Sequence, residues 1–424
     1  MARRKTRKEW VDPSSVTVMV LGGGRGTRLY PLTRDRAKPA VGFGGKYRLV
    51  DIVLTNCLRS KLNRIFILTQ FNSYSLNRHI WQTYSRFTLA EEGIIDVIAA
   101  EQTPDSRDWF QGTADAVRQS LRHVLARNPR HVLVLSADQI YSMDYRELLA
   151  WHLDHEAHVT LAALRTPESE VHRLGVVGVD DDMRIVGFAE KPETTEEVAD
   201  LRVDGHPALE PAAGKPFLGS MGIYLFNTDV LAEALDNDFE DFGHEVIPHT
   251  AQRRTMSCFP FDGYWEDVGT IEAFYDANMD WRKASGIAAM FQRGASIITH
   301  SRQLPPARIE GTLVDDSIIA GGCHIHAERI ARSIIGLRSR VGDATVVEDS
   351  ILMGNDYDEG PVPFEIGRQC HIRRAIIDKN AVLGDGTVID PSPDAPDADH
   401  DLYSIRSGIV VIPRTAVLPQ GTRI

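Results

Sequence analysis

Between residues 16 and 285, short apolar runs rich in β-branched residues alternate with longer segments of helical periodicity. Runs of the first kind predict buried strands, and apolar residues that recur every three or four positions predict helices. The expected strands cover residues 16–21, 65–69, 94–100, 131–136 and 159–164, and the expected helices cover residues 74–86, 113–126 and 145–155. This alternation predicts a mostly parallel, mixed α/β sheet that binds ligands beyond the carboxyl ends of its strands.

After residue 287 the pattern changes to apolar residues at six-residue steps. The series are Leu313, Ile319 and Ile325; Ile335, Val341, Val347 and Met353; Ile376, Val382 and Val388; Ile405, Val411 and Val417; and Ile412, Leu418 and Ile424. Short repeats of this period predict a β-helix in which each rung buries its neighbours. We therefore expect a disordered tail over residues 1–15, an α/β domain over residues 16–286 and a β-helix domain over residues 287–424.

The first expected strand ends in the glycine-rich segment GGGRGTRLYPLT, and the chain continues to AKP. Glycines allow backbone amides to approach a ligand closely, and successive amides in such a turn form an anion-binding concavity. Arg28 and Lys38 add two cations, so the segment predicts a polyphosphate site, with a simple tight turn as the alternative. It fits neither the dinucleotide fingerprint nor the Walker loop.

Composition and charge narrow the classes of partner. A net charge of −12 disfavours nucleic acid, because phosphate backbones attract basic surfaces. Residues 3–8 are the basic exception, which we expect to be a solvated tail, with a nucleic-acid arm as the alternative. No apolar run approaches the roughly 18 residues of a membrane span. The four cysteines are widely spaced, which predicts neither disulfides nor a metal site and fits a reducing cytoplasm.

Four segments carry a family resemblance. The glycine-rich segment is similar to the GGxGTRLxPLT…KP motif of sugar-nucleotide pyrophosphorylases. The continuation RAKPAVGFGGKYRLVD, then LTQFNSYSLNRH (residues 68–79) and WFQGTADAV (residues 109–117), resemble the ADP-glucose pyrophosphorylases, or glucose-1-phosphate adenylyltransferases. The resemblance covers nearly all of the chain from residue 16 and is greatest to the cyanobacterial and plant branch. It implies a Rossmann-like, GT-A-like nucleotidyltransferase domain, a left-handed parallel β-helix and a homotetramer.

The resemblance implies a nucleotide site formed by Leu21, Gly22, Gly23, Gln70, Gln111, Gly112 and Thr113. Gln70 would read the adenine edge, because a wrong base would leave its buried amide unpaired; an ordinary loop amide is the alternative. The loop at residues 111–113 would close over the base and ribose. Thr113 as an N-cap, with Asp115 in the first helical turn, would explain the same residues structurally.

The segment LGVVGVDDDMRIVGFAEKP predicts a hairpin around residues 180–182. Here the resemblance implies a glucose 1-phosphate site formed by Phe110, Gly175, Glu190, Lys191 and Ser220. Lys191 would neutralise the phosphate and Glu190 would accept hydrogen bonds from sugar hydroxyls, whereas a solvated surface pair is the alternative. Residues 193–216 predict an exposed insertion, and we expect a structural role for residues 241–245.

Asp138 follows the expected strand 131–136 beside the phosphate loop, where a carboxylate suits Mg²⁺; a helix N-cap is the alternative. Asp267 is the second metal carboxylate by resemblance alone. The family's SGDH is replaced by Ser136-Ala137-Asp138-Gln139, which leaves the role of its usual histidine open. Thr270 is expected to cap the following helix.

Two cations of the β-helix domain, Lys379 and Arg414, match lysines that bind the activator 3-phosphoglycerate in the cyanobacterial and plant branch. Arg414 presents a planar fork where those relatives have the point charge of lysine. Exposed basic residues without a ligand are the alternative. Asp35 stands where fructose-bisphosphate-activated relatives carry lysine, which favours a 3-phosphoglycerate-like effector.

The resemblance thus implies a cytoplasmic, allosteric, Mg²⁺-dependent enzyme that makes ADP-glucose and pyrophosphate from ATP and glucose 1-phosphate for glycogen or starch-like glucan synthesis. Its catalytic residues would be Arg28, Lys38 and Asp138. No general base is needed, because the attacking phosphate oxygen is already anionic. Three alternatives remain: a non-catalytic regulatory subunit of the same family, a binding protein like the β-helix subunits of the translation exchange factor, and a pyrophosphorylase using UTP or dTTP.

Overall fold

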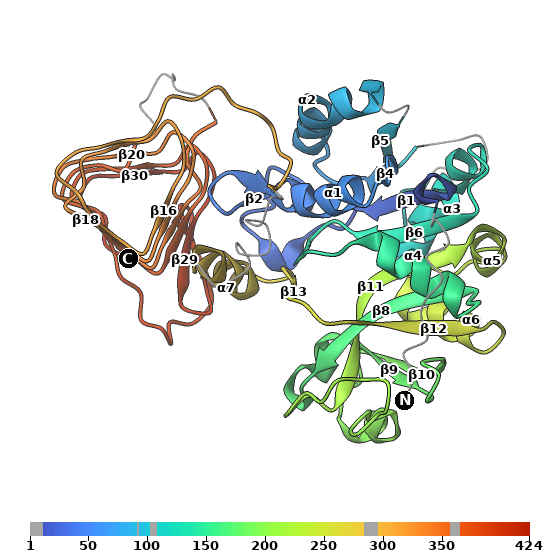
Figure 1. The fold of residues 1–424 in the computed structure, drawn as a ribbon. Helices are drawn as coiled ribbons and strands as arrows, with labels where there is room; N and C mark the ends of the chain where they lie inside the picture. Colours follow the sequence, from blue (N-terminus) through green and yellow to red (C-terminus); the bar gives the residue numbers. More distant parts are fainter. Residues whose placement is uncertain (1–11, 91–92, 102–107, 284–295, 357–364) are drawn as a thin grey trace.

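A computed structural model describes residues 12–90, 93–101, 108–283, 296–356 and 365–424, which form an α/β domain followed by a β-helix (Figure 1). Only residues 12–15 of the predicted tail belong to the described part. Pro13–Ser15 form a 3-10 helix in which the Asp12 carboxylate accepts a hydrogen bond from the backbone of Ser14. Disorder was therefore the wrong prediction for these residues. The basic residues 3–8 and the predicted boundary at 286–287 lie outside the described residues.

The α/β domain is built on a sheet of nine described strands in which β1 (Val16–Leu21) is central. It pairs in parallel with β4 (Arg64–Thr69) on one side and with β6 (His131–Ser136) on the other. The other strands are β5 (Ile94–Ala99), β8 (Val159–Thr166), β9 (Gly175–Val179), β10 (Ile185–Glu190), β11 (Phe217–Asn227) and β12 (Met256–Phe261). The five predicted strands and the hairpin β9–β10 are thus confirmed, and the carboxyl ends of β1, β4 and β6 meet at one edge.

Helices cover both faces of this sheet, as the alternation along β1 shows. Met19 packs in a core cluster with α3, α5 and α6, whereas Val18 and Val20 pack in another with α1, α2 and α4. The bounds are α1 (Leu49–Arg59), α2 (Tyr74–Ala90), α3 (Thr113–Leu125), α4 (Tyr145–Asp154), α5 (Thr228–Ala234) and α6 (Ile247–Ala251). Helix α1 was not predicted; its residues 49–57 are all buried, including the polar residues Asp51, Thr55 and Asn56.

The insertion at residues 193–216 is only partly exposed, so its prediction was partly wrong. Glu196–Leu201 form a 3-10 helix. Val198 is buried in a small cluster with Val171, Val176 and Phe217. This segment therefore covers one side of the hairpin β9–β10.

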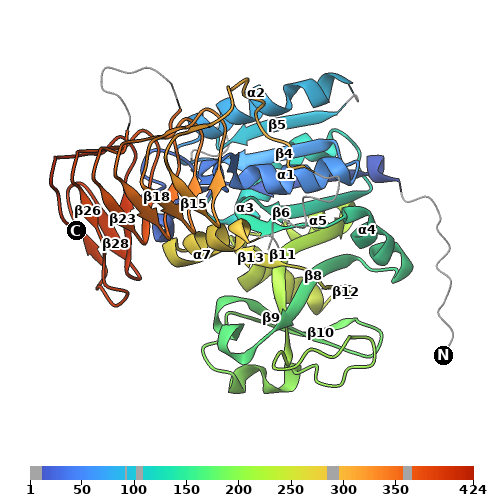
Figure 2. The same cartoon turned by 60° about the vertical axis from the view of Figure 1, so that its left-hand side comes forward.

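The second domain stacks short parallel strands into the rungs of a three-sided β-helix (Figure 2). One side comprises β15 (Leu313–Asp315), β18 (Arg329–Ala331), β21 (Val346–Glu348), β23 (His371–Arg373) and β26 (Val388–Ile389). The next side comprises β16 (Ile318–Ile319), β19 (Ile334–Ile335), β22 (Ile351–Leu352), β24 (Ala375–Ile377), β29 (Ile409–Ile412), β28 (Ser404–Arg406) and β27 (Ala398–Asp399). The third side comprises β14 (Arg308–Ile309), β17 (His324–Ile325), β20 (Arg340–Val341), β25 (Val382–Leu383) and β30 (Val417–Leu418). The chain turns between the first two sides at residues with positive φ, such as Arg332 and Asp349. The predicted β-helix is confirmed.

The predicted apolar phase holds in the middle rungs, but Leu313 in the first rung is 61% exposed and the phase slips again near the C-terminus. Ile335 and Val341 point inward as expected, but near the C-terminus Leu383 and Ile389 are buried, whereas Val382 and Val388 are only half-buried. Val417 is exposed next to buried Leu418. The loops between rungs differ in length, so a fixed step of six loses register.

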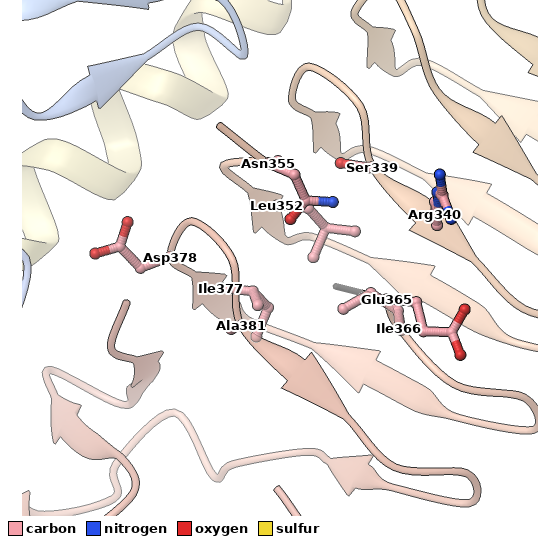
Figure 3. Close-up of a pocket in the computed structure, with 10 residues that line it drawn as sticks. Ser339, Arg340, Leu352, Asn355, Glu365, Ile366, Ile377, Asp378 and Ala381 are labelled. Carbon is pink, nitrogen blue, oxygen red and sulfur yellow. The ribbon is translucent and has the colours of Figure 1, made fainter. Parts of the chain in front are cut away.

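Within the β-helix, Ser339, Leu352, Asn355 and Ile377 help to line a cavity of about 20 Å³ (Figure 3). That volume is close to the space one water molecule occupies. The Asp378 carboxylate points away from the other labelled side chains (Figure 3). It faces the α/β domain instead.

The two domains share a continuous interface with an apolar core and a buried ion pair. Helix α7 (Ile271–Arg282) packs against β19, and its Trp281 belongs to a buried cluster that also contains Ile334 and Met353 of the β-helix. Beside this cluster, the Arg36 guanidinium donates to the Asp378 carboxylate, and both side chains are almost fully buried. The ion pair therefore joins the segment that follows the glycine-rich loop to the β-helix.

Removing one partner of the Arg36–Asp378 pair should destabilise the protein more than replacing both. Asp378→Asn leaves a buried guanidinium without its counter-ion, which typically costs about 3–5 kcal/mol, whereas Arg36→Met with Asp378→Leu removes both charges. Calorimetry should show the larger fall in unfolding temperature for the single variant. Glu168→Gln, which breaks the exposed Arg202–Glu168 pair, is the control and should change little. Equal losses in the single and double variants would contradict this account.

Candidate active site

The glycine-rich segment leaves β1 and crosses the end of β4. The Gly22 amide donates to the Leu68 carbonyl at 2.8 Å. A Cβ atom at Gly22 would lie 3.2 Å from that carbonyl and from Pro39, whereas a Cβ atom at Gly24 would meet nothing within 4 Å. The turn is thus held tightly at its start and open further along, as a loop that receives a ligand must be.

Asp138 and Asp267 lie together although they are far apart in the sequence. Strands β7 (Gln139–Tyr141) and β13 (Trp265–Asp267) pair antiparallel, with Gln139 opposite Asp267. The Lys38 Nζ atom donates to Asp138 Oδ2 at 2.5 Å and lies 3.8 Å from Asp267 Oδ1. Three predicted site residues therefore meet at the carboxyl ends of β1 and β6.

The two carboxyl groups titrate differently. Burial raises the pKa of Asp267 and the charge of Asp138 raises it further, while Lys38 and Arg28 offset only part of this rise. Burial also raises the pKa of Asp138, but the Lys38 ammonium outweighs burial and the net pKa is lowered. Asp138 therefore ionises first, and full ionisation of the pair is favoured by further positive charge.

Gln139, which stands where the family motif has histidine, ties three strands together. Its Nε2 atom donates to the Met221 carbonyl at 2.8 Å, and its Oε1 atom accepts from the Trp265 indole at 3.2 Å. Met221 lies in the bulge of β11 that also contains Ser220. One buried neutral amide thus connects the strands of both aspartates to the strand of Ser220.

The Gln70 side chain lies beside the glycine-rich loop with one polar atom unused. Its Nε2 atom donates to the Phe110 carbonyl at 3.2 Å. Its Oε1 atom is buried without a hydrogen-bond partner among the described residues. A Cβ atom at Gly23 would lie 3.6 Å from the Gln70 side chain. Gln70 therefore offers a preplaced acceptor next to Gly23, another of the predicted nucleotide residues.

Helix α3 begins differently from the prediction. Its N-cap is Gly112, where a Cβ atom would lie 2.2 Å from the Glu240 carbonyl oxygen. The Thr113 hydroxyl instead donates to Asp241 Oδ2 at 3.1 Å and accepts from the Phe242 amide at 3.0 Å. Thr113 as an N-cap was therefore wrong. The contacts with Asp241 support the structural role expected for residues 241–245.

Two other residues of this loop, Phe110 and Gln111, lie in different surroundings. Phe110 is only 6% exposed and packs with Leu68 and Val117 in the core of the α/β domain. The structure gives its ring a packing role, and its assignment to the sugar site stays a prediction. Gln111 is exposed, and its Nε2 atom donates to the Trp109 carbonyl at 2.6 Å.

The hairpin β9–β10 gathers three of the residues assigned to the sugar phosphate. A Cβ atom at Gly175 would lie 2.7 Å from Glu190 Oε2. The Lys191 Nζ atom lies 3.0 Å from Glu190 Oε1, and its side chain is 54% exposed. Ser220 is buried, and its hydroxyl accepts from the Gly222 amide at 3.2 Å. No hydrogen bond or ion pair among the described residues joins Lys191 to Asp138.

A second candidate site lies at the domain interface, in a cavity of about 640 Å³. Described residues that line it include the first turn of α2 and five arginines: Arg48, Arg78, Arg302, Arg338 and Arg414. Only Arg414 was predicted. The other four come from separate segments in which no local motif marks them. The second predicted cation, Lys379, adjoins the cavity and shares with Arg414 the carboxylate of Asp356.

Among the described residues, no group of three or more histidine, cysteine, aspartate or glutamate side chains is arranged to hold a metal ion. A metal at Asp138 and Asp267 would therefore need ligands from substrate or water.

None of the helices in the described ranges has the length and apolarity to cross a membrane.

Comparison with known proteins matches both parts of the chain. A family model described as nucleotidyl transferase matches residues 17–284, and one described as the GLGC left-handed parallel beta-helix domain matches residues 302–423. The chain is 43% identical over 431 residues to the glucose-1-phosphate adenylyltransferase small subunit, chloroplastic/amyloplastic, of Triticum aestivum. That match covers 96% of this chain and 91% of the relative. The predicted order of domains and the left-handed β-helix are thus confirmed.

Replacing Gln139 should destabilise the protein according to how many of its hydrogen bonds are lost. Gln139→Leu leaves the Met221 carbonyl and the Trp265 indole unpaired in a buried place, at about 1–3 kcal/mol for each group. Gln139→His retains one donor and one acceptor. Thermal unfolding followed by tryptophan fluorescence should show a larger loss for leucine than for histidine; equal losses would contradict the bridging role.

Proposed function

The chain belongs to the glucose-1-phosphate adenylyltransferase family of nucleotidyl transferases, and we propose that it makes ADP-glucose and pyrophosphate from ATP and glucose 1-phosphate. The observation that carries this proposal is the placement of Lys38 between Asp138 and Asp267, beside an open glycine-rich loop. This arrangement concentrates fixed charge where a parallel sheet binds its ligands.

The reaction is a direct displacement at phosphorus. A phosphate oxygen of glucose 1-phosphate attacks the α-phosphorus of ATP, and the bond to the bridging oxygen breaks. Pyrophosphate leaves with that electron pair. The attacking oxygen is already anionic, so no side chain has to remove a proton. The chain must supply alignment and positive charge, which we assign to Arg28 and Lys38 at the leaving phosphates.

Mg²⁺ is the metal that the two aspartates fit. It prefers oxygen ligands and is typically held by one or two carboxylates together with phosphate oxygens. Asp138 and Asp267 would hold it. The raised pKa of Asp267 is consistent with this role, because Lys38 and Arg28 do not fully neutralise the two carboxylates. When bound, Mg²⁺ would neutralise charge on the reacting phosphates.

The unused acceptor of Gln70 supports adenine as the base. The adenine amino group donates hydrogen bonds, whereas uracil and thymine present a carbonyl oxygen at the corresponding edge. A buried acceptor facing another acceptor remains unpaired, which costs binding energy. Gly22, Gly23 and the loop at residues 111–113 are proposed to hold the rest of the nucleotide.

Lys191 and Glu190 are proposed to bind glucose 1-phosphate. Lys191 is an exposed cation directly after β10, and its only described ion pair is with Glu190. An incoming phosphate would give the ammonium a stronger partner, and the Glu190 carboxylate could then accept from sugar hydroxyls. Gly175 allows the close approach of Glu190, and Ser220 is proposed as a further hydroxyl ligand.

The arginine-lined cavity is proposed as the site of a phosphorylated effector, with 3-phosphoglycerate favoured. Clustered guanidinium groups recognise phosphate and carboxylate, and the N-terminal turn of α2 adds backbone donors. Lys379 and Arg414 are the effector residues that the sequence indicated. Asp35 also lines the cavity, where its charge disfavours a second phosphate.

A homotetramer and a cytoplasmic location remain predictions; the wheat relative's name places that protein in plastids.

An assay of the purified chain with each of ATP, UTP and dTTP, with and without 3-phosphoglycerate and fructose 1,6-bisphosphate, tests this proposal. We expect ATP and glucose 1-phosphate to give ADP-glucose and pyrophosphate. Preference for UTP or dTTP would overturn the assignment of Gln70. No turnover with any nucleotide would favour the non-catalytic subunit or the binding protein.

Asp138→Asn should lower turnover on the order of 10²–10³-fold, because it removes a preorganised charge at the reacting phosphates. Circular dichroism should show an unchanged fold. Asp181→Asn, on the exposed turn of the hairpin, is the matched control and should keep normal turnover. Near-normal activity of the Asp138 variant would remove this residue from the metal site.

Lys191→Ala should mainly raise the KM for glucose 1-phosphate, by about tenfold, with little change in the KM for ATP. The reason is that the ammonium contacts only the sugar phosphate in this proposal. Steady-state kinetics at saturating ATP measure the effect. Lys215→Ala, which removes an exposed lysine of the insertion, is the control. An unchanged KM would exclude Lys191 from the sugar-phosphate site.

A further inference from the structure

The two predicted effector cations are both bound to one internal carboxylate. The Lys379 Nζ atom lies 2.6 Å from Asp356 Oδ1, and the Arg414 Nη2 atom lies 2.6 Å from Asp356 Oδ2. Each oxygen of Asp356 thus has its own cation. Asp356 and Arg414 line the arginine-lined cavity. The Asp356 carboxylate therefore stands at the wall where an anionic ligand would enter.

The charges around Asp356 are only partly shielded by water. Burial by itself would raise the pKa of Asp356, but Lys379 and Arg414 outweigh it and hold the pKa well below the ordinary value. Burial lowers the pKa of Lys379 to about 8. Arg48 and Arg302 add positive charge from the α/β domain and the segment that follows it. One carboxylate therefore faces more positive charge than it can neutralise.

Backbone hydrogen bonds hold the segments that carry both cations without help from Asp356. The Asn380 amide donates to the Gly354 carbonyl at 3.2 Å, and the Thr415 amide donates to the Lys379 carbonyl at 3.1 Å. These bonds connect successive rungs of the β-helix. The Arg414 carbonyl in turn accepts from the Arg34 guanidinium at 3.0 Å. Loss of the Asp356 charge would thus leave these backbone segments in place and remove the carboxylate that the two cations share.

We propose that Asp356 is an internal anion that occupies the effector's place, so that it sets the affinity of the site and its preference for phosphate over carboxylate. This inference rests on the effector site of the proposed function. A phosphate dianion that displaces Asp356 brings more charge and more acceptor oxygens to the same cations. A monocarboxylate exchanges one charge for an equal charge and gains little.

The test compares the full-length chain with Asp356→Asn, Asp356→Ser and the control Asp35→Asn. Asp35 lines the same cavity but pairs with Arg34 at 3.1 Å, so its variant changes the cavity charge equally without touching the two cations. Isothermal titration calorimetry measures binding of 3-phosphoglycerate and of glycerate, which lacks the phosphate. The activation assay gives the half-saturating concentration of 3-phosphoglycerate.

We expect both Asp356 variants to bind 3-phosphoglycerate about tenfold more tightly, the size expected for one partly buried charge interaction, and the Asp35 control to change about twofold or less. We also expect the preference for 3-phosphoglycerate over glycerate to narrow, because unpaired cations gain from any anion. A purely structural role would lower the unfolding temperature without changing this ratio.

Unchanged or weaker binding in both Asp356 variants, while the wild-type chain binds and responds normally, would overturn the inference. It would mean that Asp356 positions the cations rather than competing with the effector. If the wild-type chain neither binds 3-phosphoglycerate nor responds to it, the effector site itself is wrong and the inference falls with it. Binding by the wild-type chain separates these two failures.

Discussion

The contact of Lys38 with Asp138 and Asp267 is the interaction on which the catalytic site depends. Two carboxylates held this close repel each other, and partial burial adds to the cost of ionising both. One ammonium between them makes ionisation of the pair possible. The two aspartates can therefore both ionise only while the segment that carries Lys38 keeps its ammonium group beside them.

The short segment at residues 34–38 ties that ammonium to the rest of the molecule. Its alternate residues reach three different partners: Arg34 donates to the Arg414 carbonyl, Arg36 pairs with Asp378, and Lys38 contacts Asp138. Asp378 also accepts from the amide of Lys379. The segment thus contacts both a proposed effector residue, Arg414, and a proposed catalytic carboxylate, Asp138. One continuous stretch of backbone, residues 34–38, therefore connects the two sites.

The domain interface combines an apolar core with fixed charges at its edge. Trp281 and its neighbours bury the side of the β-helix that faces the α/β domain, which supplies most of the attraction between the domains. The arginine-lined cavity lies beside this core. Because the core holds the domains together, the cations around the cavity can remain close to one another despite their mutual repulsion.

The sequence by itself determined the elements whose cause is local: the strands of the α/β domain, the glycine-rich loop, the hairpin before Lys191 and the rungs of the β-helix. The strand-and-helix prediction missed α1, whose residues 49–57 are all buried, and a fixed step of six could not give the register of the last rungs, which depends on loop length. Only the tertiary structure decided that Asp267 meets Asp138, that Phe110 belongs to the core, and that four further arginines share a cavity with Arg414. The physical reason is that charge and packing act through space, between residues whose separation along the chain carries no signal.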